Sequence, residues 1–250
     1  MSRVAFLSLG MIAAVSAVPG AASAANLVQN GNFAQTSYTF NNEFGTAWTQ
    51  PNMQGVTDWT GNAGYNLFYF NGTATTNSAN SQYDSGYNTG LEKLYATGGF
   101  TGTSPHGDNF VALDGDTGLG GGGAISQTVS GLTVGASYVL SFVWAGGQLQ
   151  SRTGATTEKI QAQFGSQIDT TLAASIPSQG FAGWYNQSYT FVATSTSQVL
   201  TLLSIGTPAS LPPVALVTDV SLTKVPEPGT MAVLGVGIGG LMAARRRRQG

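Results

Sequence analysis

The segment 138–144 reads YVLSFVW and alternates large apolar side chains with other residues. In a β-strand, successive side chains point to opposite faces of the sheet, so residues two apart share a face. A strand here has one large apolar face, formed by Tyr138, Leu140, Phe142 and Trp144. We expect this face to lie in the core of an all-β domain.

Similar apolar runs recur along the chain, separated by clusters of glycine, asparagine, serine and proline. Helical periodicity is nearly absent from this part, and the pattern is typical of β-sandwiches. We predict further strands at 124–129, 189–193, 198–203 and 214–223, and weaker ones at 109–113 and 161–164. The segment 61–107 shows a strand pattern only around 66–70, so we predict long loops there.

The N-terminal residues have the features of a secretory signal peptide. Arg3 supplies a positive start, residues 4–18 are apolar, and Ala22 and Ala24 occupy the small-residue positions of a cleavage site. We expect cleavage after Ala24, which leaves Ala25 as the new N-terminus.

The C-terminal residues combine a proline motif, an apolar segment and a basic cluster. The apolar segment, 229–244, has 16 residues. This is slightly shorter than the roughly 17–25 residues that span a bilayer comfortably. Basic residues after it favour a cytoplasmic C-terminus. A transient anchor fits best, and a permanent anchor is the alternative. The flanking motifs are Val225, Pro226, Glu227 and Pro228 before the segment, and Arg245, Arg246, Arg247 and Arg248 after it.

The order and spacing of these features resemble the PEP-CTERM tail of exported bacterial proteins. In that family, an exosortase recognises the tail and processes it during export. The resemblance implies an exosortase-type partner, transient association with the inner membrane, and a final place in the cell envelope or extracellular matrix. It divides the chain into a signal peptide (1–24), a β-domain (25–224) and a sorting signal (225–250).

The composition of residues 25–224 excludes several classes of function. This part contains ten acidic and four basic residues, so it does not favour binding to nucleic acid through phosphate contacts. The chain has no cysteine, which excludes thiol catalysis and cysteine-ligated zinc. A surface rich in hydroxyl and amide groups suits neutral polar ligands such as sugars.

Several short motifs resemble the galactose-binding-like, carbohydrate-binding jelly-roll modules. They are NLVQNGNF (26–33), VTDW (56–59), ISQTV (125–129), GLTVG (131–135) and YVLSF (138–142). The resemblance implies a jelly-roll β-sandwich, and related modules bind carbohydrates.

The same resemblance implies a candidate site for structural calcium. Jelly rolls of this type often hold calcium near the chain ends, and Asp219 occupies the usual position on the closing strand. The N-terminal position that is often glutamate is Ala34 here, which removes one carboxylate. The alternative is that Asp219 accepts hydrogen bonds from backbone amides near the N-terminal strand. No other cofactor is expected.

Tyrosines within 61–107 lie among asparagine, serine and glycine, where an aromatic ring can stack on a sugar. Tyr83 and Tyr87 flank Asp84, so two rings and a carboxylate can converge on one glycan. The alternative is that the tyrosines of this segment fasten long loops to the sandwich.

The sequence offers weak signals for catalysis. His106 is the only histidine, and no nucleophile motif accompanies it. Asp108, Asp114 and Asp116 lie close in sequence, and glycoside hydrolases use a pair of carboxyl groups. We therefore expect an exported, non-enzymatic structural or adhesive protein associated with exopolysaccharide. The alternatives are a dedicated carbohydrate-binding protein and a polysaccharide hydrolase.

Overall fold

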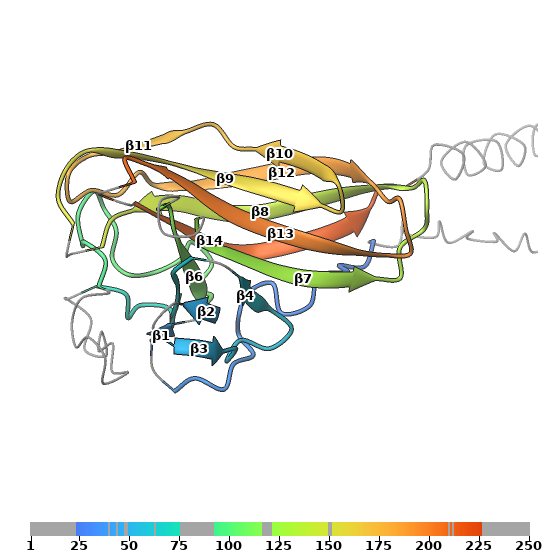
Figure 1. Ribbon diagram of the computed structural model, residues 1–250, viewed down its shortest axis with the longest axis horizontal. Coiled ribbons are helices and arrows are strands. Elements are labelled where there is room, and N and C mark those ends of the chain that lie inside the picture. The colour runs from blue at the N-terminus through green and yellow to red at the C-terminus, as the bar shows by residue number, and fades with distance from the viewer. Residues whose placement is uncertain are drawn as a thin grey trace, which may run out of the picture.

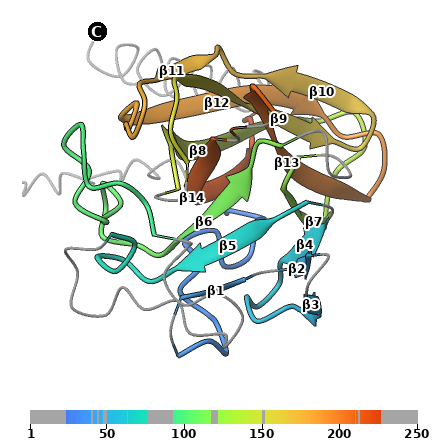
Figure 2. The same cartoon turned by 60° about the vertical axis from the view of Figure 1, so that its left-hand side comes forward.

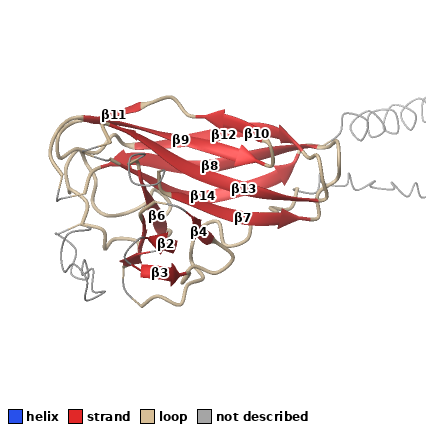
Figure 3. Cartoon of the chain, viewed as in Figure 1, coloured by secondary structure: helices blue, strands red, loops and turns tan. Residues whose placement is uncertain are grey.

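The computed structural model describes residues 24–39, 41–43, 45–47, 50–62, 64–75, 93–116, 122–149, 152–209, 211 and 213–226. Every regular element in these ranges is a β-strand (Figure 3). Among the same residues, no helix is long and apolar enough to cross a membrane. The predicted membrane segment, 229–244, lies outside the described residues.

Two antiparallel sheets face each other as a jelly-roll β-sandwich (Figure 1). The first sheet has the strand order β1 (Asn42–Glu43), β5 (Asn66–Tyr69), β6 (Phe110–Asp114), β14 (Val214–Lys224), β8 (Ser137–Gly147) and β12 (Trp184–Val192). The second has the order β10 (Gln167–Thr170), β9 (Thr156–Phe164), β13 (Ser197–Thr207), β7 (Ala124–Ser130) and β4 (Thr60–Asn62), and β11 (Ala174–Ile176) also pairs with β9. A separate hairpin contains β2 (Gly45–Ala47) and β3 (Gln50–Met53).

The strand predicted at 138–144 is confirmed. Strand β8 contains 138–144, and its four large side chains are at most 2% exposed. They lie in one hydrophobic cluster with Ile160, Leu200 and Leu202 of the second sheet. The period-two pattern therefore identified the inward face correctly, and the core lies between the two sheets.

A second hydrophobic cluster covers the other face of the first sheet. Tyr69, Phe110 and Leu216 of strands β5, β6 and β14 are buried there, and these strands lie near each other in the view of Figure 2. Phe100 packs over them, with its ring centroid 6.3 Å from that of Phe110 and 4.6 Å from that of Phe181. The first sheet is therefore buried on both faces in this region.

This cluster decides the role of part of the long-loop segment. Tyr69 is buried and stacks on Phe110 at 5.4 Å, and Tyr65 packs against the same cluster. Tyr69 is therefore a core residue of β5, and Tyr65 fastens the residues before this strand to the sandwich, as the alternative expects. Tyr83, Asp84 and Tyr87 lie outside the described residues, so their glycan-binding role stays a prediction.

Candidate functional site

The N-terminal motif docks against the closing strand. The Asn26 side-chain oxygen accepts hydrogen bonds from the backbone amides of Val28 (3.0 Å) and Leu222 (2.9 Å). The Val220 amide donates to the Gly31 carbonyl at 3.0 Å. A Cβ atom at Gly31 would lie 1.9 Å from the Val220 carbonyl oxygen, so only glycine allows this approach. The asparagine and glycine of NLVQNGNF therefore fix the start of the domain on β14.

Strand β14 contains a β-bulge at this contact. Its register with β8 shifts between Thr218 and Ser221, so two residues of β14 oppose Phe142. Asp219 adopts the left-handed region with φ 53°, which aspartate tolerates better than most residues. Bulges redirect side chains out of the regular alternation. The bulge therefore turns the Asp219 carboxylate toward the loop before β6.

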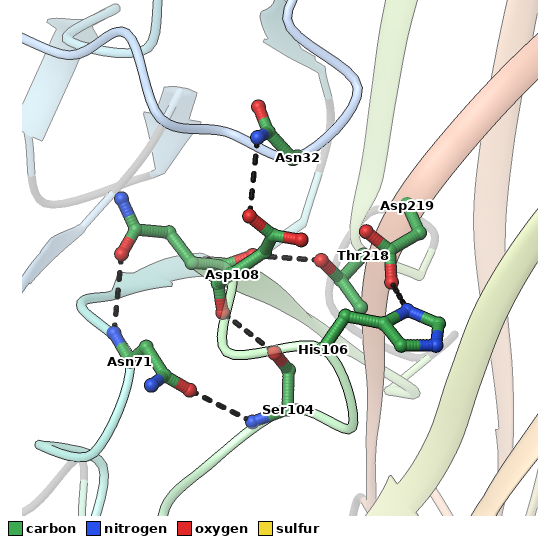
Figure 4. Close-up of polar contacts among 8 residues, drawn as sticks. Asn32, Asn71, Ser104, His106, Asp108, Thr218 and Asp219 are labelled. Atoms are coloured by element: carbon green, nitrogen blue, oxygen red, sulfur yellow. Dashed lines mark hydrogen bonds and ion pairs between the residues drawn. The ribbon is translucent and has the colours of Figure 1, made fainter.

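We call His106, Asp108, Asp219 and Asn32 the bulge cluster (Figure 4). The Nδ1 atom of His106 lies 2.7 Å from Oδ2 of Asp219. The Asn32 side-chain amide donates to Oδ1 of Asp108 at 3.1 Å. The Ser104 hydroxyl donates to the Asp108 carbonyl at 2.8 Å, which holds the loop in place. The cluster thus joins the N-terminal motif, the loop and the closing strand.

The electrostatics of the bulge cluster follow from two close carboxyl groups. Burial raises the pKa of Asp219, and the neighbouring Asp108 raises it further, whereas His106 lowers it. The His106 side chain is 62% exposed, and ion pairs at exposed positions contribute about 0–1 kcal/mol. The cluster therefore links the N-terminal motif, the loop before β6 and strand β14, and it contributes little to the free energy of unfolding.

The structure corrects one prediction about Asp219 and leaves another as a prediction. The alternative that Asp219 bonds backbone amides is wrong, because its carboxylate pairs with the His106 ring. The described residues contain no group of three or more histidine, cysteine, aspartate or glutamate residues arranged to hold a metal ion. Calcium prefers six to eight oxygen ligands. Calcium at Asp219 remains a prediction.

A second pair of carboxyl groups, Asp114 and Glu158, lies near the end of the sandwich where β14 begins. Asp114 ends β6, whereas Asp108 precedes it, so the six intervening residue steps separate them by about 20 Å along an extended chain. That is beyond the roughly 5–9.5 Å of glycosidase carboxyl pairs. Asp114 instead lies near Glu158 on β9, whose pKa is raised mainly by burial and to a smaller degree by the Asp114 carboxyl.

Glu158 is held in a fully buried position. It is 0% exposed, and its Oε1 atom accepts hydrogen bonds from the amides of Lys159 (2.8 Å) and Ile205 (3.1 Å). Burial raises its pKa to about 8, and burial also raises the pKa of Asp114 to about 6. Glu158 is therefore protonated at neutral pH, and it cannot reach a substrate from this position.

A polar groove lies along β4 and β7, with a volume of about 530 Å³. The Gln127 side chain lines this groove. Its amide oxygen accepts a hydrogen bond from the Gln29 backbone amide (2.8 Å), and its amide nitrogen donates to the Asp58 backbone carbonyl (3.0 Å), so its position is fixed. Asp58 and Thr128 are exposed at its rim. Sequence reasoning missed this groove, although the motifs at 56–59 and 125–129 contain several of its residues.

The buried Glu158 carboxyl predicts a pH-dependent stability. Between pH 6 and 8 the folded state keeps the Glu158 proton, whereas the unfolded state, with a pKa near 4.5, has lost it. Folding stability should therefore fall with rising pH in this window, by up to about 1.4 kcal/mol per pH unit. Glu158→Gln should remove this slope in urea unfolding curves between pH 7 and 8, where Asp114, with a pKa of about 6, contributes little.

The control for that experiment is Asp169→Asn, an exposed carboxyl on β10. It should keep the wild-type slope between pH 6 and 8. A Glu158→Gln protein with an unchanged slope would contradict the assignment of Glu158 as the titrating group.

Two family models match parts of the chain. Residues 224–248 match the PEP-CTERM protein-sorting motif, and residues 94–215 match the protein family of unknown function DUF642. No curated protein matches the chain. The sorting motif indicates a secreted, cell-surface protein.

Several solved structures are similar to this chain. The CBM22-1 xylan-binding domain of Paenibacillus barcinonensis Xyn10C has a TM-score of 0.41 at 11% identity, covering 83% of this chain and 99% of that one. The C-terminal family 22 carbohydrate-binding module of Clostridium thermocellum Xyn10B has 0.38 at 11%, covering 77% and 97%. TmCBM61, solved with β-1,4-galactotriose, has 0.35 at 10%, covering 80% and 99%.

The sorting motif begins at the last residue of strand β14, and the DUF642 match runs from residue 94 to the start of that strand. The chain thus carries a jelly-roll β-sandwich, in which residues 94–215 match DUF642, followed by a match to the PEP-CTERM sorting motif at 224–248.

Proposed function

We propose that the chain is a non-enzymatic envelope or extracellular-matrix protein that an exosortase-type enzyme sorts and that associates with exopolysaccharide. The observation that carries this proposal is the junction between fold and motif. Strand β14 ends at Lys224, and the Val225 amide still donates to the Ser137 carbonyl at 2.8 Å. The sorting motif therefore follows the last strand of the sandwich directly. The domain that this motif would deliver is the sandwich.

The chemistry of the domain supports an association with a neutral polymer. Its outward positions on β12 and β13 include Asn186, Ser188, Thr190, Thr201 and Thr207. Hydroxyl and amide groups can exchange hydrogen bonds with sugar hydroxyls without a large cost of desolvating charge. The excess of acidic residues disfavours nucleic acid as the partner.

Three described groups that the sequence offered for catalysis are held by structural contacts or buried, which supports a role without catalysis. His106 pairs with Asp219, the Ser104 hydroxyl donates to the Asp108 carbonyl, and Glu158 is fully buried. The hydrolase alternative would require turnover on a panel of polysaccharides.

Processing of the tail gives the first test of the proposed function. Protein recovered from the cell surface should begin at Ala25 and lack Arg245–Arg248 in intact-mass measurements. Replacing Pro226, Glu227 and Pro228 with alanine should leave the precursor in the inner membrane, because recognition is lost while the apolar segment remains.

Thr153→Ala provides the control, because Thr153 is exposed in the loop between β8 and β9. This variant should be sorted as the wild type is. Surface delivery of the alanine-motif variant, or surface protein that keeps its arginines, would argue against exosortase-type processing and for a permanent anchor.

A dedicated carbohydrate-binding protein is the second candidate, and the groove along β4 and β7 favours it. Its lining supplies the amides of Gln29 and Gln54, the hydroxyls of Thr60 and Thr128, and the Asp58 carboxylate. These groups match the donors and acceptors of a sugar. Gln54 is held in place because it exchanges two hydrogen bonds with the Gly61 backbone (2.9 and 3.2 Å).

Binding to purified exopolysaccharide tests this candidate. Asp58→Asn keeps a side chain that tolerates the left-handed backbone (φ 66°) and removes the charge. A lost hydrogen bond to a charged group costs about 1.5–3 kcal/mol, so affinity should fall roughly tenfold or more. Asp169→Asn, at the opposite edge of the same sheet, should bind normally.

The double variant Tyr83→Ala/Tyr87→Ala tests the other candidate glycan site in the same assay. Loss of binding in this variant alone would place the glycan on the segment 61–107 and not in the groove. Wild-type protein that binds no polysaccharide would contradict both sites and leave a purely structural role.

A further inference from the structure

Both ends of the predicted mature chain lie at one end of the sandwich (Figure 1). The Leu27 amide donates to the Leu222 carbonyl at 2.9 Å. Asn26 forms an antiparallel bridge with Thr223. The predicted signal-cleavage site and the sorting motif therefore lie side by side, at the end of strand β14.

The connection to the predicted membrane segment is short. Four residue steps separate Val225, whose amide is held in the sheet, from Gly229, where the apolar segment begins. A fully extended chain covers at most about 3.6 Å per step, or about 14 Å. The headgroup layer on each side of the hydrocarbon core is about 5–8 Å thick. When the apolar segment enters a bilayer, this end of the sandwich must therefore come close to the headgroups.

The short apolar segment also favours a position of the domain close to the headgroups. With 16 residues, it is shorter than a comfortable span. A segment that is too short draws its flanking residues toward the hydrocarbon core or thins the bilayer. Both responses bring the domain nearer to the lipid.

The surface at this end is shaped by one turn and the two chain ends. Val134 is at the turn between β7 and β8 and is 59% exposed. The Lys224 ammonium lies 3.4 Å from the Thr133 hydroxyl. A groove of about 560 Å³ runs between this turn and the chain ends, lined by Ala25, Leu27, Thr133, Lys224 and Pro226 among others.

The charge of this end differs from that of the rest of the domain. Among the described segments that form it, 24–27, 130–136, 193–197 and 223–226, Lys224 is the only charged side chain. Removal of the signal peptide would add the α-amino group of Ala25. The acidic residues of the domain lie in other segments. Together with Glu227 of the sorting motif, these two positive groups leave this end without the net negative charge that the rest of the domain carries.

We propose that this end of the sandwich is a membrane-facing surface, formed by Ala25, Thr133, Val134, Lys224 and Pro226, which we call the terminal face. It lies on the lipid headgroups while the sorting tail is inserted, with Val134 in contact with the lipid. The inference rests on the proposed function only in requiring that the tail enters a membrane. It places the sorting motif within the headgroup layer before processing.

The absence of cysteine from the sequence makes a direct test simple. Val134→Cys and Thr153→Cys each introduce one exposed labelling site, at opposite ends of the sandwich. The 11 residues of β14 separate these ends by roughly 35 Å. The full chain is labelled with a fluorescent probe and inserted into vesicles of phosphatidylethanolamine and phosphatidylglycerol that contain a headgroup spin label. The Val134→Cys probe should be quenched several-fold more than the Thr153→Cys probe.

Resistance to alkaline carbonate reports insertion separately. Inserted protein with equal quenching of the two probes would overturn the terminal face and leave the proposed function intact. Quenching that requires native membranes with the processing enzyme would also overturn it, because the partner would be a protein and not lipid. Protein that carbonate removes would contradict both this inference and the anchored tail.

Discussion

The pairing of the N-terminal motif with strand β14 is the contact on which the rest of the structure depends. Strand β14 lies between β6 and β8 in the middle of the first sheet. Gly31 lies against Val220 of this strand, in a space that no larger residue could occupy. The same strand therefore carries the core, the bulge and the junction with the sorting motif. A change that loosens it would affect all three.

The strands of the sandwich were predictable because burial between two sheets leaves a strong trace in the sequence. The period-two pattern located β8 and its inward face correctly, and the apolar runs located β7, β13 and β14. The same rule places Glu158 on the inward face of β9 with Ile160 and Phe164, so the buried carboxyl had a readable signal. The sequence pattern predicts a strand only over 161–164, the C-terminal part of β9, and Glu158 lies before this range.

Other features depend on contacts that a linear sequence does not show. His106 and Asp219 are 113 residues apart and meet only because the bulge turns the aspartate toward the loop. The second hydrophobic cluster brings Phe100 and Phe181 together over the first sheet, although neither lies in a recognisable strand pattern. Short-range periodicity describes which face of a strand is buried, but it contains no information about which loop covers the opposite face.

The sequence signals at the two ends of the chain and the fold between them agree with each other. The matched motif indicates sorting, and the fold brings the predicted signal-cleavage site and the sorting motif together at one end of the sandwich. Hydrogen exchange measured by mass spectrometry tests this claim most directly, because it reports on the amides of Leu27, Leu222 and Val225. In the full-length precursor, these amides should exchange as slowly as those in the centre of β8. Fast exchange at both ends, with β8 still protected, would show that the chain ends are not joined and would contradict the account.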